Sequence, residues 1–306
     1  MHQDNCAIPW KTLSTKQIIS GISDITLHWM MRALPIDICS YIGSILGKFL
    51  GPRHKDANNR LRNNIKFLRP HLSAIELEQL VEKWWGNHGR VLAEFSVLRR
   101  IWKSNRTAIA GNQHIDHAKQ IGRPIIFLFL HTGNWEIAGP KLAKLFDQHP
   151  IHIYQEIDNY FQMKIAKNIR APYADHLIKP HFSAGRKIYK KLISGHPLII
   201  AVDEHVNGKL NGPSFGRELS ASGNVTFALR LAKLSNAILL PFYTTRTSGA
   251  NFTVTILPAM EFDFYNFNDT DLKAAQIKID EITDHIIRQN VDQWYYATTS
   301  GLFENA

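Results

Sequence analysis

Six consecutive apolar residues, Ile125 to Leu130, constrain the fold of this chain more than any other stretch. The run is rich in β-branched and aromatic residues and follows Pro124, so it predicts a β-strand. A strand without polar alternation is buried on both faces, as in a parallel sheet covered by helices. His131 comes directly after this strand. It is therefore expected at the carboxyl end, where ligands bind in open α/β sheets.

Strand and helix patterns alternate along the rest of the chain. Strands are predicted at residues 124–130, 151–155, 176–179, 197–202, 237–243 and 252–257. Helices are predicted at residues 135–146, 158–170, 183–194, 223–234 and 269–289. This alternation predicts an α/β fold with a mainly parallel sheet flanked by helices on both faces. Pro140 lacks a backbone donor, so the helix around it is expected to be irregular or to begin later.

Three regions are predicted, without a break in composition between them. Residues 1–24 form a variable amino-terminal tail, residues 25–110 a helical membrane-associating arm, and residues 111–306 an α/β core continuous with the arm. Ser73 and Glu76 form a capping box that opens one helix of the arm. The apolar segment 25–50 is interrupted by charged residues. It is expected to pack as a core helix pair, to lie in a membrane interface, or to cross a membrane at a tilt.

Basic residues outnumber acidic ones, with 36 Lys and Arg against 26 Asp and Glu and a formal net charge of +10. This excess suggests an acidic partner: nucleic acid, an anionic membrane, a phosphorylated substrate or an acidic carrier protein. Sparse aromatic residues among the basic ones disfavour nucleic acid. The two cysteines, Cys6 and Cys39, have no metal or redox spacing, and no signal peptide is recognisable, so a reducing cytoplasmic setting is expected.

Known catalytic motifs of several enzyme classes are missing from the sequence. It has no His-Glu-x-x-His, no Gly-x-Ser-x-Gly, no phosphate-binding loop and no Gly-x-Gly-x-x-Gly after a strand. These absences disfavour zinc proteases, serine esterases, nucleotide hydrolases and dinucleotide-dependent dehydrogenases.

His131 is followed five residues later by Glu136, in the predicted first turn of a helix. Gly133 permits the intervening turn and Asn134 suits the helix cap. If the two side chains meet, the carboxylate takes the Nδ1 proton of the imidazole and leaves Nε2 free to remove a proton from an alcohol. A strand-end histidine satisfied by a helix cap is the alternative, and the spacing alone leaves both open.

A second polar strand end lies at Asp203, after the apolar strand 197–202. Since strand ends on the same side of a parallel sheet converge, Asp203 is expected near His131, although a turn or capping role is equally open. Between the two strand ends runs a basic band of Lys164, Lys167, Arg170, Lys179, Arg186, Lys187, Lys190 and Lys191. Its arginines, Arg170 and Arg186, suit bidentate binding of phosphate.

The segment His131-Thr-Gly-Asn-Trp-Glu136 resembles the His-x4-Asp/Glu box of the lysophospholipid acyltransferase superfamily. Its Gly-Asn-Trp-Glu form resembles the bacterial lipid A late acyltransferases, the Kdo-lipid A lauroyl and myristoyl transferases. The likeness covers about residues 25–295 and includes Asn59–Pro70, Asn87–Arg90 with Glu94-Phe95, Gly111–His114, Gly122–Ile125, Phe215–Arg217, Gly223 and Gln293-Trp294.

This resemblance implies a membrane-associated enzyme on the cytoplasmic face of the inner membrane. The enzyme would transfer a fatty acyl chain from acyl carrier protein to a hydroxyl of a lipid A precursor in lipopolysaccharide biosynthesis. The resemblance implies no cofactor and no metal. Its partners would be the acidic carrier protein and the phosphorylated glycolipid acceptor.

The resemblance also implies roles for particular residues. His131 would be the general base and Glu136 the carboxylate that orients it. Helix-start amides near Gly133 and Asn134, or an arginine, would hold the thioester oxyanion. The substrate-binding residues would be Asn134, Arg170, Arg186, Asp203 and Arg217.

Two positions depart from the usual family pattern. Glu204 follows Asp203 where Gln is commoner, and the segment after Trp294 lacks the usual His-x-Arg. The acceptor therefore stays open between a lipid A precursor and another lipid, such as a lysophospholipid, an aminolipid or a different glycolipid. A non-catalytic protein that binds lipid or carrier protein is a further alternative.

Overall fold

The computed structural model describes residues 14–154, 157, 159–172, 177–179, 183–206, 209–264 and 266–299. The predicted positions 155, 158 and 176, most of the predicted tail 1–24, and Cys6 lie outside these residues. Five helices come first: α1 (Thr15–Ala33), α2 (Ile36–Leu50), α3 (Lys55–Leu68), α4 (Ala74–Glu94) and α5 (Leu98–Lys103). The later α-helices are α6 (Asn112–Ile121), α7 (Ala138–Ala143), α8 (Tyr160–Arg170), α9 (Ala184–Ile193), α10 (Asn224–Ser235) and α11 (Asp269–Gln289).

The main sheet has seven strands in the order β1-β9-β8-β2-β5-β3-β4. They are β1 (Thr107–Ala110), β2 (Ile125–Phe129), β3 (Ile151–Ile153), β4 (Leu177–Ile178), β5 (Leu198–Ala201), β8 (Ile238–Ser248) and β9 (Asn251–Ile256). Strands β8, β2, β5, β3 and β4 are parallel, whereas β9 runs antiparallel to β8, and β1 pairs parallel with β9. A separate short hairpin joins β6 (His205–Val206) to β7 (Lys209–Leu210). The predicted α/β fold with a mainly parallel sheet is confirmed.

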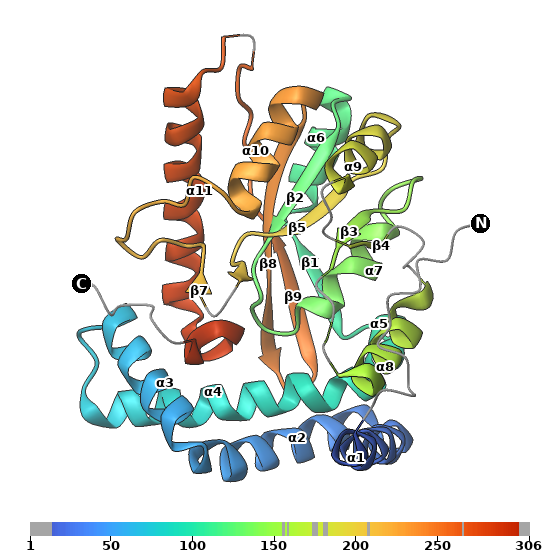
Figure 1. Ribbon diagram of the computed structural model, residues 1–306, viewed down its shortest axis with the longest axis vertical. Coiled ribbons are helices and arrows are strands. Elements are labelled where there is room, and N and C mark those ends of the chain that lie inside the picture. Colours follow the sequence, from blue (N-terminus) through green and yellow to red (C-terminus); the bar gives the residue numbers. More distant parts are fainter. Residues whose placement is uncertain are drawn as a thin grey trace.

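Strand β2 is buried on both faces, as its apolar run predicts. Ile126 and Leu128 lie in one hydrophobic core with residues of α9, α10 and α11. Ile125 and Phe127 lie in a second core with residues of α6 and α7. Helices therefore cover both faces of the sheet, and Figure 1 shows β2 at its centre. This position fixes the end of β2, and the turn that follows it, in the middle of the molecule.

Local signals in the sequence explain how two of the helices begin. At α4, the Ser73 N–H donates to Glu76 Oε2 at 2.8 Å, and the Glu76 N–H donates to Ser73 Oγ at 3.3 Å, which completes the predicted capping box. After β2, a 3-10 turn (Trp135–Ile137) precedes α7, so that Pro140 falls in the first turn of that helix. An N–H in this turn has no intrahelical acceptor, so the proline is tolerated there. The expected irregular start is confirmed.

The first helices form a layer beneath the carboxyl edge of the sheet, at the bottom of Figure 1. Helices α2 and α4 approach backbone to backbone: a Cβ on Gly89 would lie 2.1 Å from the Gly43 carbonyl oxygen. The predicted boundary between residues 24 and 25 falls inside the continuous helix α1. The predicted arm, residues 25–110, also includes β1, which belongs to the sheet.

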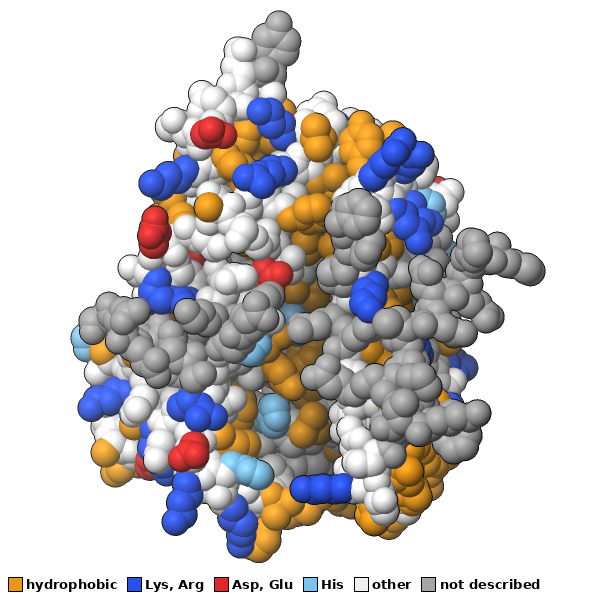
Figure 2. All heavy atoms as spheres, viewed as in Figure 1, with side chains coloured by type: hydrophobic (Ala, Val, Ile, Leu, Met, Phe, Trp, Pro, Cys, Tyr) orange, Lys and Arg blue, Asp and Glu red, His pale blue; other side chains and the backbone are white. Residues whose placement is uncertain are grey.

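Helices α1 and α2 leave many large apolar side chains in solvent. On α1 these are Ile18, Ile19, Ile22, Leu27, Trp29 and Met30; on α2 they are Ile38, Tyr41, Ile45, Leu46, Phe49 and Leu50. Figure 2 shows hydrophobic side chains along the lower edge, where these helices lie. Across the described part of the chain, no helix is both long and apolar enough to cross a membrane. We call these exposed side chains the apolar face of α1 and α2.

Candidate active site

His131 is held by Asp203, which comes from the neighbouring strand. Strands β2 and β5 pair with Phe129 opposite Ala201, and His131 and Asp203 each follow two residues later. The distance from His131 Nδ1 to Asp203 Oδ1 is 2.8 Å, and the His131 backbone N–H donates to Asp203 Oδ2 at 2.8 Å. Because the buried carboxylate accepts the Nδ1 proton, the neutral imidazole carries its free lone pair on Nε2. The predicted proximity of these two residues is confirmed.

Glu136 makes no hydrogen bond or ion pair with the imidazole, whose Nδ1 is bound to Asp203, so the predicted pairing of His131 with Glu136 is wrong. Its carboxylate binds the guanidinium of Arg170 on α8: Arg170 Nε donates to Glu136 Oε2 at 3.1 Å, and a second, shorter bond joins Nη2 to Oε1. Residues of a 3-10 turn point about 120° apart. Since the Trp135 ring lies against His131, with centroids 5.0 Å apart, Glu136 is directed away toward α8.

Aromatic rings surround the imidazole on its other sides. Phe129, Trp135 and Tyr296 all have ring centroids within 5.2 Å of the His131 ring. The side chain of His131 keeps 17% of its surface exposed, and its Nε2 makes no hydrogen bond to any described residue. Burial and the nearby charge of Asp203 raise the pKa of Tyr296, so its phenol stays protonated. In Figure 2, histidine side chains lie at a central hollow that hydrophobic side chains line.

A carboxyl-terminal segment binds the turn after His131. The Gly133 N–H donates to the Gln293 carbonyl at 3.0 Å, and the Tyr295 N–H donates to the His131 carbonyl at 2.8 Å. Trp294, fully buried between them, donates from its indole to Asp203 Oδ2 at 3.0 Å. The Gly133 amide is therefore already used and does not face an oxyanion, contrary to expectation. We call residues 293–295 the carboxyl-terminal clasp.

Asn134 is buried behind the turn, with 1% of its surface exposed. Its Nδ2 donates to Glu94 Oε2 on α4 at 3.0 Å. Glu94 is itself fully buried and pairs with Arg246 of β8. The predicted substrate-binding residue Asn134 is thus placed as an internal anchor of the turn.

The three predicted arginines occupy different settings. Arg170 forms the ion pair with Glu136. Arg217 donates to the carbonyls of Ser214, Leu210 and Pro213, at 2.8, 3.2 and 3.0 Å, and so ties its own loop together. Arg186 is exposed on α9 and has no ion pair with another described residue. The structure does not bring these three side chains together around His131.

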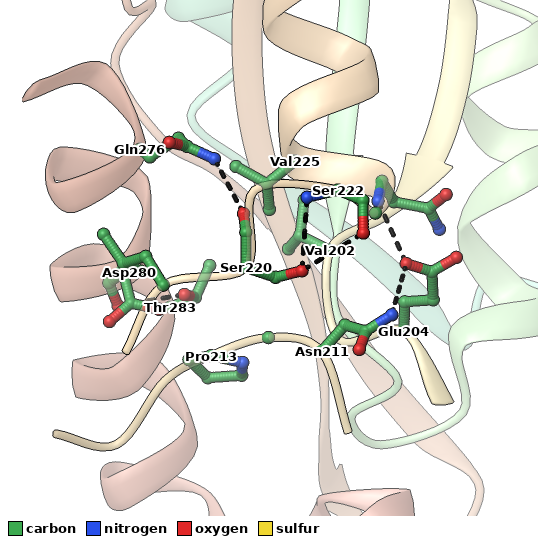
Figure 3. A pocket seen from close by; sticks show the side chains of 14 residues that line it. Val202, Glu204, Asn211, Pro213, Ser220, Ser222, Val225, Gln276, Asp280 and Thr283 are labelled. Carbon is green, nitrogen blue, oxygen red and sulfur yellow. Dashed lines mark hydrogen bonds between the residues drawn. The ribbon is translucent and has the colours of Figure 1, made fainter. Parts of the chain in front are cut away.

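A polar pocket lies next to Asp203, between the loop that precedes α10 and the helix α11 (Figure 3). Glu204 Oε2 accepts from the Asn224 backbone N–H at 3.0 Å and from Asn211 Nδ2 at 3.4 Å. Asn224 is the first residue of α10, where backbone amides favour an anion. The chain's own carboxylate takes this place, so the start of α10 is closed to a phosphate group.

Several residues of the site were not predicted as such from the sequence. Asp203 was expected near His131 and as a substrate contact, but not as the carboxylate that binds Nδ1. Trp294 and Glu94 appeared only as parts of a family-like pattern. A buried Trp and a Glu in an apolar helix face were the available signals, because both need a polar partner when buried. Among the described residues, no group of three His, Cys, Asp or Glu side chains is placed to hold a metal ion.

Fold and site together define an α/β protein with a histidine–aspartate pair at the carboxyl edge of its sheet. The family model for the bacterial lipid A biosynthesis acyltransferases matches residues 10–298, and the chain belongs to this family. It is thus an acyltransferase, and the resemblance of its sequence to the lipid A acyltransferases is confirmed.

Two further similarities accompany this match. The chain is 21% identical, over 278 residues, to a lipid A biosynthesis acyltransferase of Haemophilus influenzae, covering 84% of this chain and 80% of that protein. Among solved structures, it is similar to the 1-acyl-sn-glycerophosphate acyltransferase PlsC of Thermotoga maritima. That similarity has a TM-score of 0.37 and 15% identity, and covers 75% of this chain and 97% of the other.

Proposed function

We propose that this protein transfers a fatty acyl chain from acyl carrier protein to a hydroxyl of a lipid A precursor, in lipopolysaccharide biosynthesis. The observation that carries the proposal is the pair of His131 and Asp203, whose Nδ1 to Oδ1 distance is 2.8 Å. With Nδ1 committed to the carboxylate, Nε2 is the atom that accepts a proton from the acceptor hydroxyl.

The reaction then proceeds by direct transfer. His131 Nε2 takes the hydroxyl proton while the alcohol oxygen attacks the thioester carbonyl carbon. As the tetrahedral intermediate collapses, the C–S bond breaks and the imidazolium returns its proton to the departing thiolate of the carrier. Asp203 stabilises the transient imidazolium. General-base catalysis of this kind contributes about 10² to 10⁴ in rate.

The oxyanion of that intermediate needs hydrogen-bond donors close to the turn. We assign this role to the backbone amides of Asn134 and Trp135. Neither amide is bonded to another group in the part of the chain that the structure describes. The ion pair of Glu136 and Arg170 lies on the far side of the same turn and fixes it against α8.

The acyl donor is the acidic carrier protein, and its docking surface in this proposal is the basic side of α8 and α9. Lys164 and Lys167 are exposed on α8, and Arg186, Lys187 and Lys190 are exposed on α9. Opposite charge increases the rate at which two proteins meet. The phosphorylated glycolipid is the second anionic partner of this surface.

The acceptor lies in a membrane, and the proposal places the enzyme on the cytoplasmic face of the inner membrane. The apolar face of α1 and α2 supports this location, because large apolar patches on a protein surface mark interaction sites. Trp29, with Arg32 stacked 4.9 Å above its ring, is 57% exposed and suits a lipid headgroup region. Helix α4 joins this face to the carboxyl edge of the sheet (Figure 1).

Transfer in vitro tests the proposal directly. Radiolabelled acyl-acyl carrier protein is incubated with the purified protein and either a Kdo-lipid A precursor or a lysophospholipid. We expect an added acyl chain on the lipid A precursor, and none with His131→Ala, whose circular dichroism spectrum should match that of the wild type. Acylation of only the lysophospholipid would replace the proposed acceptor. If neither lipid is acylated, both proposed acceptors are rejected.

Lipid analysis in cells provides the second arm. Mass spectrometry of lipids from cells with and without the gene should show one missing secondary acyl chain on lipid A. Unchanged lipid A beside another altered lipid would point to a different acceptor.

A further inference from the structure

Glu94 is a fully buried carboxylate at the carboxyl end of α4, outside the contacts of the catalytic histidine. It accepts hydrogen bonds from three separate elements. Arg246 on β8 donates from Nη1 and Nη2 at 2.5 and 2.9 Å, Ser40 Oγ on α2 donates at 2.6 Å, and Asn134 Nδ2 in the catalytic turn donates at 3.0 Å. A single side chain thus joins the sheet, the first helices and the turn.

Such a group is costly to bury unless it is paired and hydrogen-bonded. The bidentate contact with Arg246 would alone satisfy the charge. Ser40 and Asn134 donate to the lone pairs of the Glu94 carboxylate that remain, and the bond from Asn134 connects Glu94 to the turn after His131.

The turn after His131 is fixed at two successive residues. Gly133 is bound through its backbone to Gln293, and Asn134 is bound through its side chain to Glu94. Arg246 binds both anchoring residues: its guanidinium pairs with Glu94, and its backbone N–H donates to Gln293 Oε1 at 2.6 Å. The next residue is Trp135, whose ring lies edge-on to His131 with 5.0 Å between centroids.

We propose that Glu94 is a positioning residue for acyl transfer: through Asn134 it sets the path of the turn, and hence the place of the Trp135 ring and amide beside His131. This inference rests on the proposed function. Glu94 touches neither substrate nor the reacting atoms. Through its hydrogen bond to Ser40, the same carboxylate also connects the turn to α2, the helix that bears part of the apolar face.

The test compares Glu94→Gln with Glu82→Gln, the same change at an exposed position of α4 whose ion-pair partner among the described residues is Lys48. A misplacement of about 1 Å at a reacting group can cost about 10² in rate. We expect kcat for Glu94→Gln to fall by about tenfold or more with KM for the acyl carrier within about twofold, and Glu82→Gln to match the wild type.

A double-mutant cycle shows whether Glu94 acts through the turn. If it does, Glu94→Gln combined with Asn134→Ala is no slower than Asn134→Ala alone. Rate losses that multiply in the double variant would overturn the assignment. Where Glu94→Gln alone does not fold, Glu94→Met with Arg246→Met removes the charged pair together, which buried pairs often tolerate. The same loss of kcat is expected of that variant.

A readout without turnover separates this inference from the proposed function. The ¹⁵N-labelled imidazole of His131, assigned with His131→Gln, is observed by NMR in the full-length protein. Glu94→Gln should shift or broaden this signal, and Glu82→Gln should leave it unchanged. An unchanged His131 signal and a wild-type kcat in folded Glu94→Gln would refute the positioning role. If the wild-type protein does not acylate the lipid A precursor but Glu94→Gln still changes the His131 signal, only the proposed acceptor is refuted, and the positioning role stands.

Discussion

Asp203 Oδ1 lies 2.8 Å from His131 Nδ1 although 72 residues separate the two along the chain. The contact exists because β2 and β5 are neighbours in the sheet and end at the same level. The orientation of the His131 ring therefore depends on the register of two buried strands, which close packing on both faces holds rigid. Asp203 is in turn fixed by the Trp294 indole.

Replacing Asp203 tests its role as the orienting carboxylate. Asp203→Asn keeps the shape of the side chain but removes the charge that stabilises the imidazolium and selects its tautomer. We expect kcat to fall by about 10² to 10⁴. The measurement is steady-state transfer from acyl-acyl carrier protein. Asp280→Asn, in the pocket of Figure 3, is the matched control and should retain activity. Wild-type turnover by Asp203→Asn would remove it from the site.

Glu136 and Arg170 form a half-buried ion pair, so their substitutions should be coupled. Glu136→Gln leaves the Arg170 guanidinium without its counter-charge, and we expect the melting temperature and kcat to fall together. The double variant Glu136→Gln with Arg170→Gln should recover part of both losses. Differential scanning calorimetry gives the coupling free energy, expected at about 1–3 kcal/mol. Fully additive effects would show that the pair does not stabilise the turn.

The apolar face of α1 and α2 should bind lipid. Ile45 and Phe49, 48% and 59% exposed, lie one turn apart on α2. Ile45→Glu and Phe49→Glu each place a charge where an apolar side chain would enter the interface, and we expect each to weaken binding about tenfold or more. Flotation with phosphatidylethanolamine and phosphatidylglycerol vesicles measures this.

Leu234→Glu supplies the matched control for the vesicle experiment. Leu234 is 71% exposed at the carboxyl end of α10, at the opposite end of the molecule from α2 (Figure 1). The charge change is the same, so this variant should bind vesicles like the wild type. Equal losses in all three variants would mean that added negative charge, rather than the position on α2, weakens the binding.

His88 makes stability depend on pH. It stacks between Trp84 and Tyr295, and burial lowers its pKa to about 4. The unfolded chain, with a pKa near 6.5, binds a proton first as the pH falls. The contribution to stability is therefore complete above about pH 6.5 and is lost progressively between pH 6.5 and 4.

Denaturant unfolding measures this effect. Between pH 7 and pH 5 the free energy of unfolding should fall by on the order of 2 kcal/mol through His88 alone. His88→Phe should flatten that part of the profile, whereas His71→Phe, at an exposed position, should not. A profile of His88→Phe as steep as that of the wild type would assign the acid sensitivity to other groups.

Much of the fold follows from local patterns. Ile125 to Leu130 predicts a doubly buried strand because only an apolar run fits between two helix layers, and β2 confirms it. Pro140 predicts the broken helix start for reasons of backbone bonding alone. Strand β1 was missed because its four residues, half exposed and half intermediate, have no apolar pattern. The antiparallel direction of β9 is likewise set by the turn at residues 248–251, rather than by alternation.

The site was harder to predict than the fold. Sequence proximity favoured Glu136 as the partner of His131, but a helical turn sends Trp135 and Glu136 in different directions. The true partner depends on which strands are neighbours, and several sheet orders suit the same pattern of elements. Glu94 and Gln293 reach the turn from α4 and from the clasp, so their roles depend on long-range packing that no local pattern contains.

The carboxyl-terminal clasp has a consequence for synthesis of the protein. His131 leaves the ribosome well before residues 293–295 do, yet its turn is bound by them. Because amino-terminal segments fold first during translation, the sheet can form while the turn after His131 still lacks its clasp. The turn after His131 is therefore completed late in synthesis, after the strands that precede His131 and Asp203. A chain that ends just before Gln293 would keep every described strand of the sheet and helix α11, but would lack the residues that bind the turn after His131.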